Sequence, residues 1–195
     1  MQRSSTVDRI TKETKITTSL NLNGQGNNRI DTGIPFFDHM LILFAVHGFF
    51  DLEISATGDL DVDFHHTVED VGIVLGTALK NALGNRNGIK RFGHAVVPMD
   101  DTLAQVTIDL SNRPYLVYNI PQIFYQSDKF DLSLSKEFFR AFAINAGMNL
   151  HINVLYGENN HHIIEAIFKA TGKALDQAVS FDKRTKNVLS TKGTL

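Results

Sequence analysis

Apolar and polar positions change their spacing in an order that occurs twice along the chain. In the first half, alternation predicts strands over 7–20 and 49–57. The Asn- and Gly-rich stretch NLNGQGNN predicts a turn into a second short strand, so that residues 7–20 would form a hairpin with it. Apolar residues at helical spacing predict helices over 35–46 and 65–83. This half therefore contains a strand pair, a helix, a strand and a second helix.

Local signals fit the ends of both helices. Pro35 lies in the first turn of the earlier helix, where its missing amide is tolerated, and Gly48 and Gly84 stand where the helices end. Four apolar residues of the later helix are expected to face inward: Ile73, Leu75, Leu79 and Leu83. Each helix should therefore cover one face of a sheet.

The second half repeats this order. Strands are predicted over 94–110, 114–120 and 148–156, and helices over 135–146 and 161–179. Because the same elements return in the same sequence, the chain has the form of an internal repeat.

An alignment within the chain supports a duplication. Residues 39–54 align with 137–152 without gaps, and the blocks HHTVED and HHIIEA then match after a loop that is two residues shorter in the second copy. We therefore expect one domain over 1–195, with halves at about 1–88 and 89–182 and a polar tail at 183–195. The expected fold is α+β: two pseudo-symmetric fused halves, each a β-sheet layer packed against a pair of helices.

Composition narrows the class of protein. The chain has 195 residues, 43% of them apolar, and a formal net charge of −2, with basic residues dispersed, which argues against a nucleic-acid partner. It has no cysteine, so any metal must be held by His and carboxylate side chains. No apolar run has the length of a membrane span and no secretory leader is present, so we expect a cytoplasmic protein with no membrane contact.

The two HHxxE blocks carry the chemistry. Successive residues of a helix are about 100° apart, so His65, His66 and Glu69 share one arc of a helix face, with the carboxylate between the two imidazoles. Three donors spread over such an arc do not converge easily on one ion, whereas the two histidines can serve two different ions. Because the second copy offers a complementary set, the repeat predicts a site for two metals.

The internal alignment adds one position to each half, because His39 falls opposite Glu137. Eight ligands are therefore predicted: His39, His65, His66, Glu69, Glu137, His161, His162 and Glu165. Imidazole and carboxylate donors admit zinc, iron, nickel or manganese, and their type does not choose among these ions. His94 and His151 are expected to be structural, whereas His47 lies eight residues after His39 and could approach the site.

Long motifs in a fixed order resemble one enzyme family. DTGIPFFDHML, DFHHTVEDVGIVLG, RFGHAVVPMDDTLA, DLSNRPY and NNHHIIEAIFKATGKAL together are similar to the imidazoleglycerol-phosphate dehydratases of histidine biosynthesis, in their monofunctional form. The resemblance implies a duplicated fold of the ribosomal protein S5 domain 2 type, two Mn²⁺ ions per active site held by the eight ligands above, and a homo-oligomeric cage of 24 subunits. It departs at Glu137, where many members of the family have His.

The resemblance also implies a substrate site for a small phosphorylated imidazole. A phosphate pocket would be lined by four basic residues, Arg91, Arg113, Lys169 and Lys192, with hydroxyl donors from Ser190 and Thr191. Glu13 would contact substrate from a neighbouring subunit. Asp100 would bind substrate, and Asp100 and Asp101 could orient groups near the site.

For this family we expect dehydration of D-erythro-imidazole glycerol phosphate to imidazole acetol phosphate. Metal-bound ring nitrogens would favour an imidazolate that expels the neighbouring hydroxyl and leaves a diazafulvene-like intermediate. Its adjacent C–H is acidic, and Glu69 or Glu165 are the first candidates to take that proton, with Glu13 and His47 as further catalytic candidates.

Two other classes stay open at this point. A dinuclear metallohydrolase would use two bridged ions to activate water, and its reaction would release inorganic phosphate. A metal-storage or assembly protein would use the histidines to bridge subunits, and it would need no phosphate pocket, so Arg113→Ala would leave it unchanged.

Overall fold

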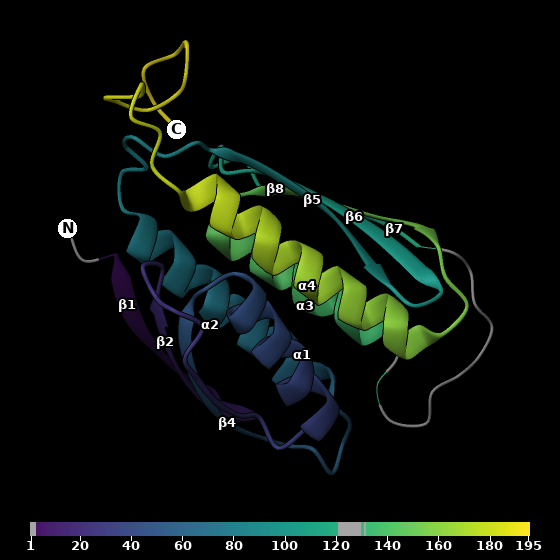
Figure 1. The fold of residues 1–195 in the computed structure, drawn as a ribbon. Coiled ribbons are helices and arrows are strands. Elements are labelled where there is room, and N and C mark those ends of the chain that lie inside the picture. Colours follow the sequence, from purple (N-terminus) through teal and green to yellow (C-terminus); the bar gives the residue numbers. More distant parts are fainter. Residues whose placement is uncertain (1–2, 121–129, 131) are drawn as a thin grey trace.

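The computed structural model describes residues 3–120, 130 and 132–195, and its elements form two halves of identical order (Figure 1). The first half contains β1 (Ser4–Ile10), β2 (Thr14–Asn21), β3 (Asn28–Asp31), α1 (Pro35–His47), β4 (Asp51–Gly58) and α2 (His65–Leu83). The second half contains β5 (Phe92–Met99), β6 (Thr102–Asp109), β7 (Tyr115–Asn119), α3 (Leu132–Ala146), β8 (Asn149–Tyr156) and α4 (Asn160–Val179).

Each half builds its own four-stranded sheet, and the two sheets have the same topology. The strand orders are β1-β2-β4-β3 and β5-β6-β8-β7, and in both sheets the last pair is parallel while the others are antiparallel. The strands that follow α1 and α3 begin at Asp51 and Asn149, which are partners in the gap-free alignment of the two halves. The predicted duplication and the α+β class are therefore confirmed.

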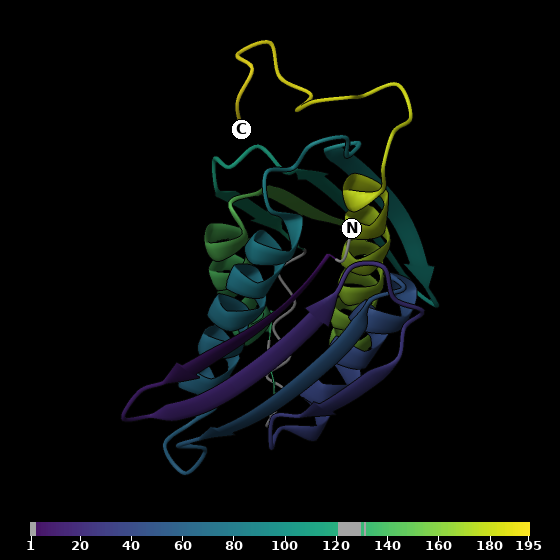
Figure 2. The same cartoon turned by 90° about the vertical axis from the view of Figure 1, so that its left-hand side faces the viewer.

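The sheets lie on the outside and the helices between them (Figures 1 and 2). The helix pairs combine the halves, because α1 packs against α4 and α2 against α3. Two equivalent glycines allow this close approach: a Cβ on Gly76 would lie 2.7 Å from the Phe142 carbonyl oxygen of α3, and one on Gly172 would lie 2.5 Å from the Phe44 carbonyl oxygen of α1. A ligand on α1 therefore meets α4, which comes from the other half of the sequence.

A continuous apolar core fills the space between the sheets. Its centre is aromatic, with Phe138 stacked on Phe142 and Phe168 and in edge contact with Phe37, and all four rings are fully buried. Since Phe168 lies on α4, three residues after Glu165, this core anchors the helix that carries the second histidine block.

Two single strands predicted by alternation are hairpins. Residues 7–20 form β1 and β2, and residues 94–110 lie in β5 and β6, each pair joined by a tight turn. The first turn contains no Gly or Pro. It is stabilised instead by the Thr11 hydroxyl, which accepts hydrogen bonds from the amide N–H groups of Glu13 and Thr14. Asp100 in the second turn has a positive φ of 46°. Threonine and aspartate side chains thus replaced the usual turn signals.

The Asn- and Gly-rich stretch is not a hairpin turn, which corrects the second prediction for this region. It carries the chain from β2 past β4 to β3, which pairs in parallel with β4. Asp51 holds this connection, because its carboxylate accepts the amide N–H groups of Gln25 and Asn27. These hydrogen bonds, with that of Gln25 first, keep the pKa of Asp51 below its usual value.

The helix predictions were close. The helix over 65–83 has the predicted bounds and the other three differ by a few residues. Of the four residues expected to face inward, Leu75, Leu79 and Leu83 are buried, whereas Ile73 is only half-buried and the adjacent Val74 takes the buried position. Within the described residues, none of the helices is long and apolar enough to cross a membrane.

Candidate metal centre and anion pocket

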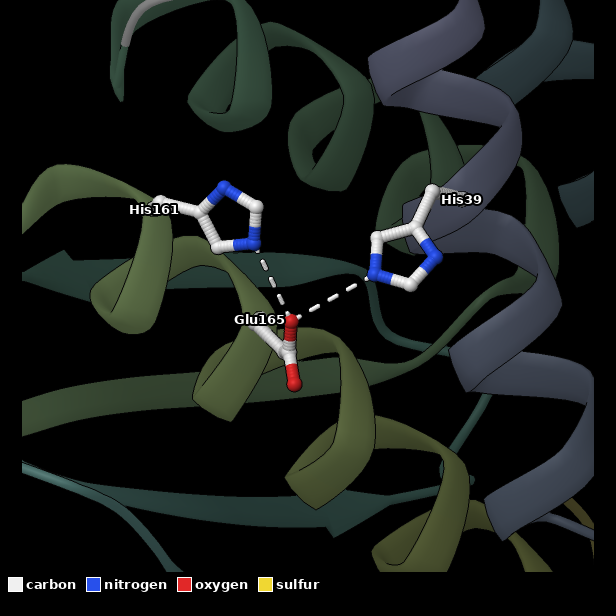
Figure 3. A group of neighbouring side chains, drawn as sticks. All are labelled: His39, His161 and Glu165. Atoms are coloured by element: carbon white, nitrogen blue, oxygen red, sulfur yellow. Dashed lines mark hydrogen bonds and ion pairs between the residues drawn. The ribbon is translucent and has the colours of Figure 1, made fainter.

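Three predicted ligands meet between α1 and α4 (Figure 3). His161 lies in the first turn of α4, Glu165 one turn later, and His39 on α1. The Nε2 atoms of His161 and His39 lie 3.2 Å and 3.4 Å from Glu165 Oε2. One ligand atom from each residue lies within 4.8 Å of the other two, and in the part of the chain that the structure describes this is the one group of at least three His, Cys, Asp or Glu side chains with that spacing. The side chains therefore converge as ligands of one divalent ion would.

Glu165 is the buried member of this cluster, with 6% of its surface exposed. Lys169, one turn further along α4, places its Nζ 2.6 Å from Glu165 Oε1. Burial alone would raise the pKa of Glu165, but the hydrogen bond and charge of Lys169, together with the hydrogen bonds of His161 and His39, outweigh it, so the pKa lies below its usual value. Glu165 is therefore held as a carboxylate with one oxygen directed at the two imidazoles.

The counterpart on α2 and α3 is looser. His65 Nε2 lies 3.8 Å from Glu69 Oε2, and both side chains are more than two-fifths exposed. Glu137 on α3, which corresponds to His39, instead pairs with Arg140 at 2.9 Å. The structure therefore brings His65 and Glu69 together, but it does not place Glu137 in a ligand cluster within one chain.

The second histidine of each block is oriented by a carboxylate. His66 Nδ1 lies 3.0 Å from Asp59 Oδ2, and His162 Nδ1 is hydrogen-bonded to Asp101 Oδ1. Asp59 raises the pKa of His66, and His162 keeps the pKa of Asp101 well below its usual value. A carboxylate on Nδ1 fixes the ring and leaves Nε2 as the ligand atom, an arrangement typical of metal-binding histidines.

Hairpin turns bring further acidic groups to these histidines. Glu13, in the turn between β1 and β2, places Oε2 3.8 Å from His66 Nδ1. Asp100, in the turn between β5 and β6, places Oδ2 3.5 Å from His162 Nε2. The predicted substrate-contacting residues Glu13 and Asp100 therefore each lie in the hairpin turn beside the histidine block of their own half.

Most of the predicted phosphate-binding residues line one pocket of about 630 Å³. The predicted residues that line it are Arg91, Arg113, Ser190, Thr191 and Lys192. The Arg91 guanidinium is held in place, because it binds both oxygens of Asp109 at 2.6 Å and 3.0 Å and donates to the Leu189 carbonyl of the tail. The tail and Arg91 together therefore form one wall of a pocket that is lined by basic and hydroxyl side chains, which would suit an anion; we call it the anion pocket.

Two predicted residues lie elsewhere. Lys169 does not line this pocket within one chain, because it pairs with Glu165 near the start of α4. His47, at the end of α1, has its pKa lowered by burial and then by the charges of Lys169 and Lys173. His47 therefore lies in a positively charged environment, which suits an anion better than a metal ion.

Sequence reasoning missed Asp59 and the role of Asp70. Asp59 is in DLDVDF, which imitates the start of a calcium loop, and only the fold shows that it points at His66. Asp70 follows Glu69 in the first block, is buried, and receives a hydrogen bond from Thr14 on β2. A single carboxylate in an amphipathic helix gives no sequence signal for such a contact.

The fold and these clusters define a class: a duplicated α+β protein with histidine–carboxylate groups suited to divalent ions and a separate anion pocket. The imidazoleglycerol-phosphate dehydratase family model matches residues 32–175. The imidazoleglycerol-phosphate dehydratases of Desulfosudis oleivorans and Syntrophobacter fumaroxidans are 60% and 59% identical to this chain; each match covers all of this chain and 100% and 98% of the relative.

Solved structures agree. The dehydratase from Pyrococcus furiosus superimposes with a TM-score of 0.84 at 42% identity, over 97% of this chain and 100% of that one. The dehydratase from Staphylococcus aureus gives 0.82 at 39% identity, over 92% and 99%. This chain belongs to the imidazoleglycerol-phosphate dehydratase family. It is therefore an enzyme of the hydro-lyase class in histidine biosynthesis, and the hydrolase and storage alternatives are set aside.

Proposed function

We propose that this enzyme removes water from D-erythro-imidazole glycerol phosphate to give imidazole acetol phosphate, with two Mn²⁺ ions at each active site. The observation that carries the proposal is the convergence of His39, His161 and Glu165 between α1 and α4. The family membership supports the reaction, and the anion pocket at Arg113 and Lys192 supports a phosphorylated substrate.

The donor set fits divalent ions such as Mn²⁺. The donors are imidazole nitrogens and carboxylate oxygens without thiolate, and the chain has no cysteine. His66 and His162 have Nδ1 bound to carboxylates, which leaves Nε2 as a ligand atom. One group of ligands would be His39, His161 and Glu165, and His65, Glu69 and Glu137 would be its counterpart, with His66 and His162 completing the eight.

When bound, the ions would supply Lewis acidity at the ring nitrogens of the substrate, which favours the imidazolate, loss of the neighbouring hydroxyl as water, and a diazafulvene-like intermediate. The proton transfers are carried out by side chains of the protein. A carboxylate of the chain takes the proton from the second carbon of the arm, and the resulting enol becomes the ketone.

The surroundings of the three candidate carboxylates divide the roles. Glu165 is tied to Lys169 and two imidazoles, and its lowered pKa makes it a weak base, so we assign it to metal binding. Glu69 and Glu13 are both exposed enough to reach a substrate, with 43% and 54% of their side chains accessible. Glu13 or Glu69 is therefore the proposed proton acceptor.

The phosphate would be bound by Arg113 and Lys192, with hydroxyl donors from Ser190 and Thr191. Arg91 already binds Asp109, so its contribution is to fix the tail and to add positive charge. Lys169 and Lys173 add positive charge beside His47, and we propose that Lys169 and His47 too face the anionic end of the substrate.

Within one chain, the metal cluster and the anion pocket lie too far apart to bind the same substrate molecule. The Arg91 amide donates to the carbonyl of Ala178, which lies thirteen positions after Glu165 on α4, about 20 Å at ~1.5 Å per residue. An imidazole with a three-carbon phosphate arm spans only about 10 Å when extended. We therefore propose that each active site combines at least two subunits, in a homo-oligomer of 24 chains.

The test is metal dependence in matched variants. Chelated enzyme should lose dehydratase activity and regain it most fully with Mn²⁺. His161→Ala should lower metal content and activity together, whereas His94→Ala, on the exposed outer face of β5, should change neither. Full activity in the metal-free enzyme, or equal effects of the two histidine variants, would refute the proposal.

A further inference from the structure

A buried hydrogen-bond network joins α2 to the turn that carries Glu13. Asp70 has 7% of its surface exposed and lies directly after the ligand Glu69. Thr14 Oγ1 donates to Asp70 Oδ2 at 2.5 Å, and Arg9 Nε forms an ion pair with Asp70 Oδ1 at 3.0 Å. The helix with the first histidine block is thus tied to both strands of the hairpin.

The direction of each hydrogen bond follows from its partners. A carboxylate only accepts, so the single hydroxyl proton of Thr14 goes to Asp70. In the 3.2 Å contact between the two threonine hydroxyls, Thr11 must then be the donor, and it shares its proton with the Thr14 carbonyl oxygen at 3.5 Å. Both lone pairs of Thr11 remain for the amide N–H groups of Glu13 and Thr14, at 3.1 Å and 2.9 Å. Asp70 therefore fixes the direction of the Thr14 hydroxyl and favours Thr11 as the donor across the turn.

The turn is also held from its other side. The Asp59 amide donates to the Glu13 carbonyl at 3.1 Å, and the Asp59 carboxylate orients His66. The Glu13 backbone is therefore fixed against the same elements that carry His66 and Glu69, and its carboxylate lies 3.8 Å from His66 Nδ1.

The other half of the molecule shows that the fold does not require this network. By strand register and block alignment, the equivalents of Arg9, Thr11, Thr14 and Asp70 are Val97, Met99, Thr102 and Ala166. That half makes the same hairpin and packs it on α4 with Ala166 fully buried. In the first half the Asp70 carboxylate is buried although the Arg9 side chain is 38% exposed, and withdrawing a carboxylate from water has a free-energy cost that the buried Ala166 avoids.

We propose that Asp70, acting through Thr14 and Thr11, is a positioning residue that holds the Glu13 carboxylate at the reacting centre. This inference rests on the proposed function, in which Glu13 is a candidate for the proton transfer. Displacement of a reacting group by about 1 Å can cost up to a hundredfold in rate, so a device that fixes this turn has a direct effect on kcat.

The test compares two equivalent substitutions in one strand. Thr14→Val removes the donor to Asp70, whereas Thr18→Val removes a buried hydroxyl that has no hydrogen-bond partner among the described residues. We expect Thr14→Val to lower kcat about tenfold or more with little change in KM. Thr14→Ser, which keeps the hydroxyl, and Thr18→Val should both keep the wild-type kcat. Equal kcat values for Thr14→Val and Thr18→Val would overturn the proposal.

A double-variant measurement separates positioning from general stability. If Thr14 acts through Glu13, Thr14→Val should add almost nothing to the loss caused by Glu13→Gln. If the two losses multiply, Thr14 has only a structural role and the proposal is wrong.

Hydrogen exchange gives a readout without substrate. The Glu13 and Thr14 amides should exchange faster in Thr14→Val and Asp70→Asn than in wild type, and at the wild-type rate in Thr18→Val. Unchanged exchange in the first two variants would overturn the network even if the enzyme dehydrates its substrate. Faster exchange in an enzyme without dehydratase activity would instead refute only the proposed function.

Discussion

The composite active site predicts complementation between two different impaired variants. His161→Ala removes a metal ligand, and Arg113→Ala removes a cation from the anion pocket. If the two features of one active site come from different subunits, particles assembled from both variants contain some sites with neither substitution. If both features came from the same chain, every site would carry one defect.

The expected recovery can be worked out from random assembly. In a one-to-one mixture, the chance that a site has an intact metal cluster is one half, and the chance that it has an intact anion pocket is also one half. About a quarter of the sites therefore carry neither substitution. Loss of a charge-assisted hydrogen bond to phosphate costs about 1.5–3 kcal/mol, so Arg113→Ala alone should keep about 1–10% of the activity. A quarter of wild-type activity is clearly above that background.

The assay is dehydratase activity of co-expressed variants, purified as mixed particles through two different tags. A matched control combines His161→Ala with Glu165→Gln, which damage the same cluster and should restore nothing. Absence of recovery in the first mixture, with both variants present in the particles, would show that a single chain supplies the cluster and the pocket of each site.

Three further predictions concern the scaffold. Arg86, with 4% of its surface exposed, donates to three backbone carbonyls, so Arg86→Ala should lower the free energy of unfolding by about 3 kcal/mol or more; an unchanged urea midpoint would count against this. Gly76→Ala would place a methyl 2.7 Å from the Phe142 carbonyl oxygen and should cost at least about 2 kcal/mol, visible as a lower Tm; an unchanged Tm would contradict this close packing. The pKa of Asp51 is lower in the folded protein than in the unfolded chain, where it is about 4. The ionised carboxylate therefore stabilises the folded state above that pH, and this contribution to the free energy of unfolding is lost as the pH falls through the folded-state pKa. Asp51→Asn should therefore destabilise at pH 7 and have a much smaller effect at strongly acidic pH in urea titrations; an equal loss at both pH values would be inconsistent with that pKa.

Periodicity predicted the helices because each buries one apolar face over several turns. The helix over 65–83 has the predicted bounds, and the alignment of 39–54 with 137–152 predicted that α1 and α3 are equivalent. The hairpins were not predictable from alternation, because neither turn uses glycine or proline. The turn at 11–13 is held by side-chain hydrogen bonds of Thr11, and the turn at 100–101 places Asp100 at a positive φ.

The site was predicted in part for a similar reason. The repeat located His39 and the two histidine blocks, but it could not show that α1 pairs with α4 and so brings His39 to Glu165. Asp59 and Asp70 could not be identified in advance, since their importance depends on contacts across 7 and 56 residues of sequence. Whether Glu137 binds metal stays a prediction, because its partner in one chain is Arg140.

The most direct measurement is the identity of the product formed from imidazole glycerol phosphate. The Mn²⁺-loaded enzyme would be incubated with substrate in D₂O, stripped of metal and followed by ¹H and ³¹P NMR. The account predicts imidazole acetol phosphate as the one product, with its phosphate ester intact and solvent deuterium on the carbon next to the ring, since the enol becomes the ketone there. Release of inorganic phosphate, or unchanged substrate with metal bound, would contradict it.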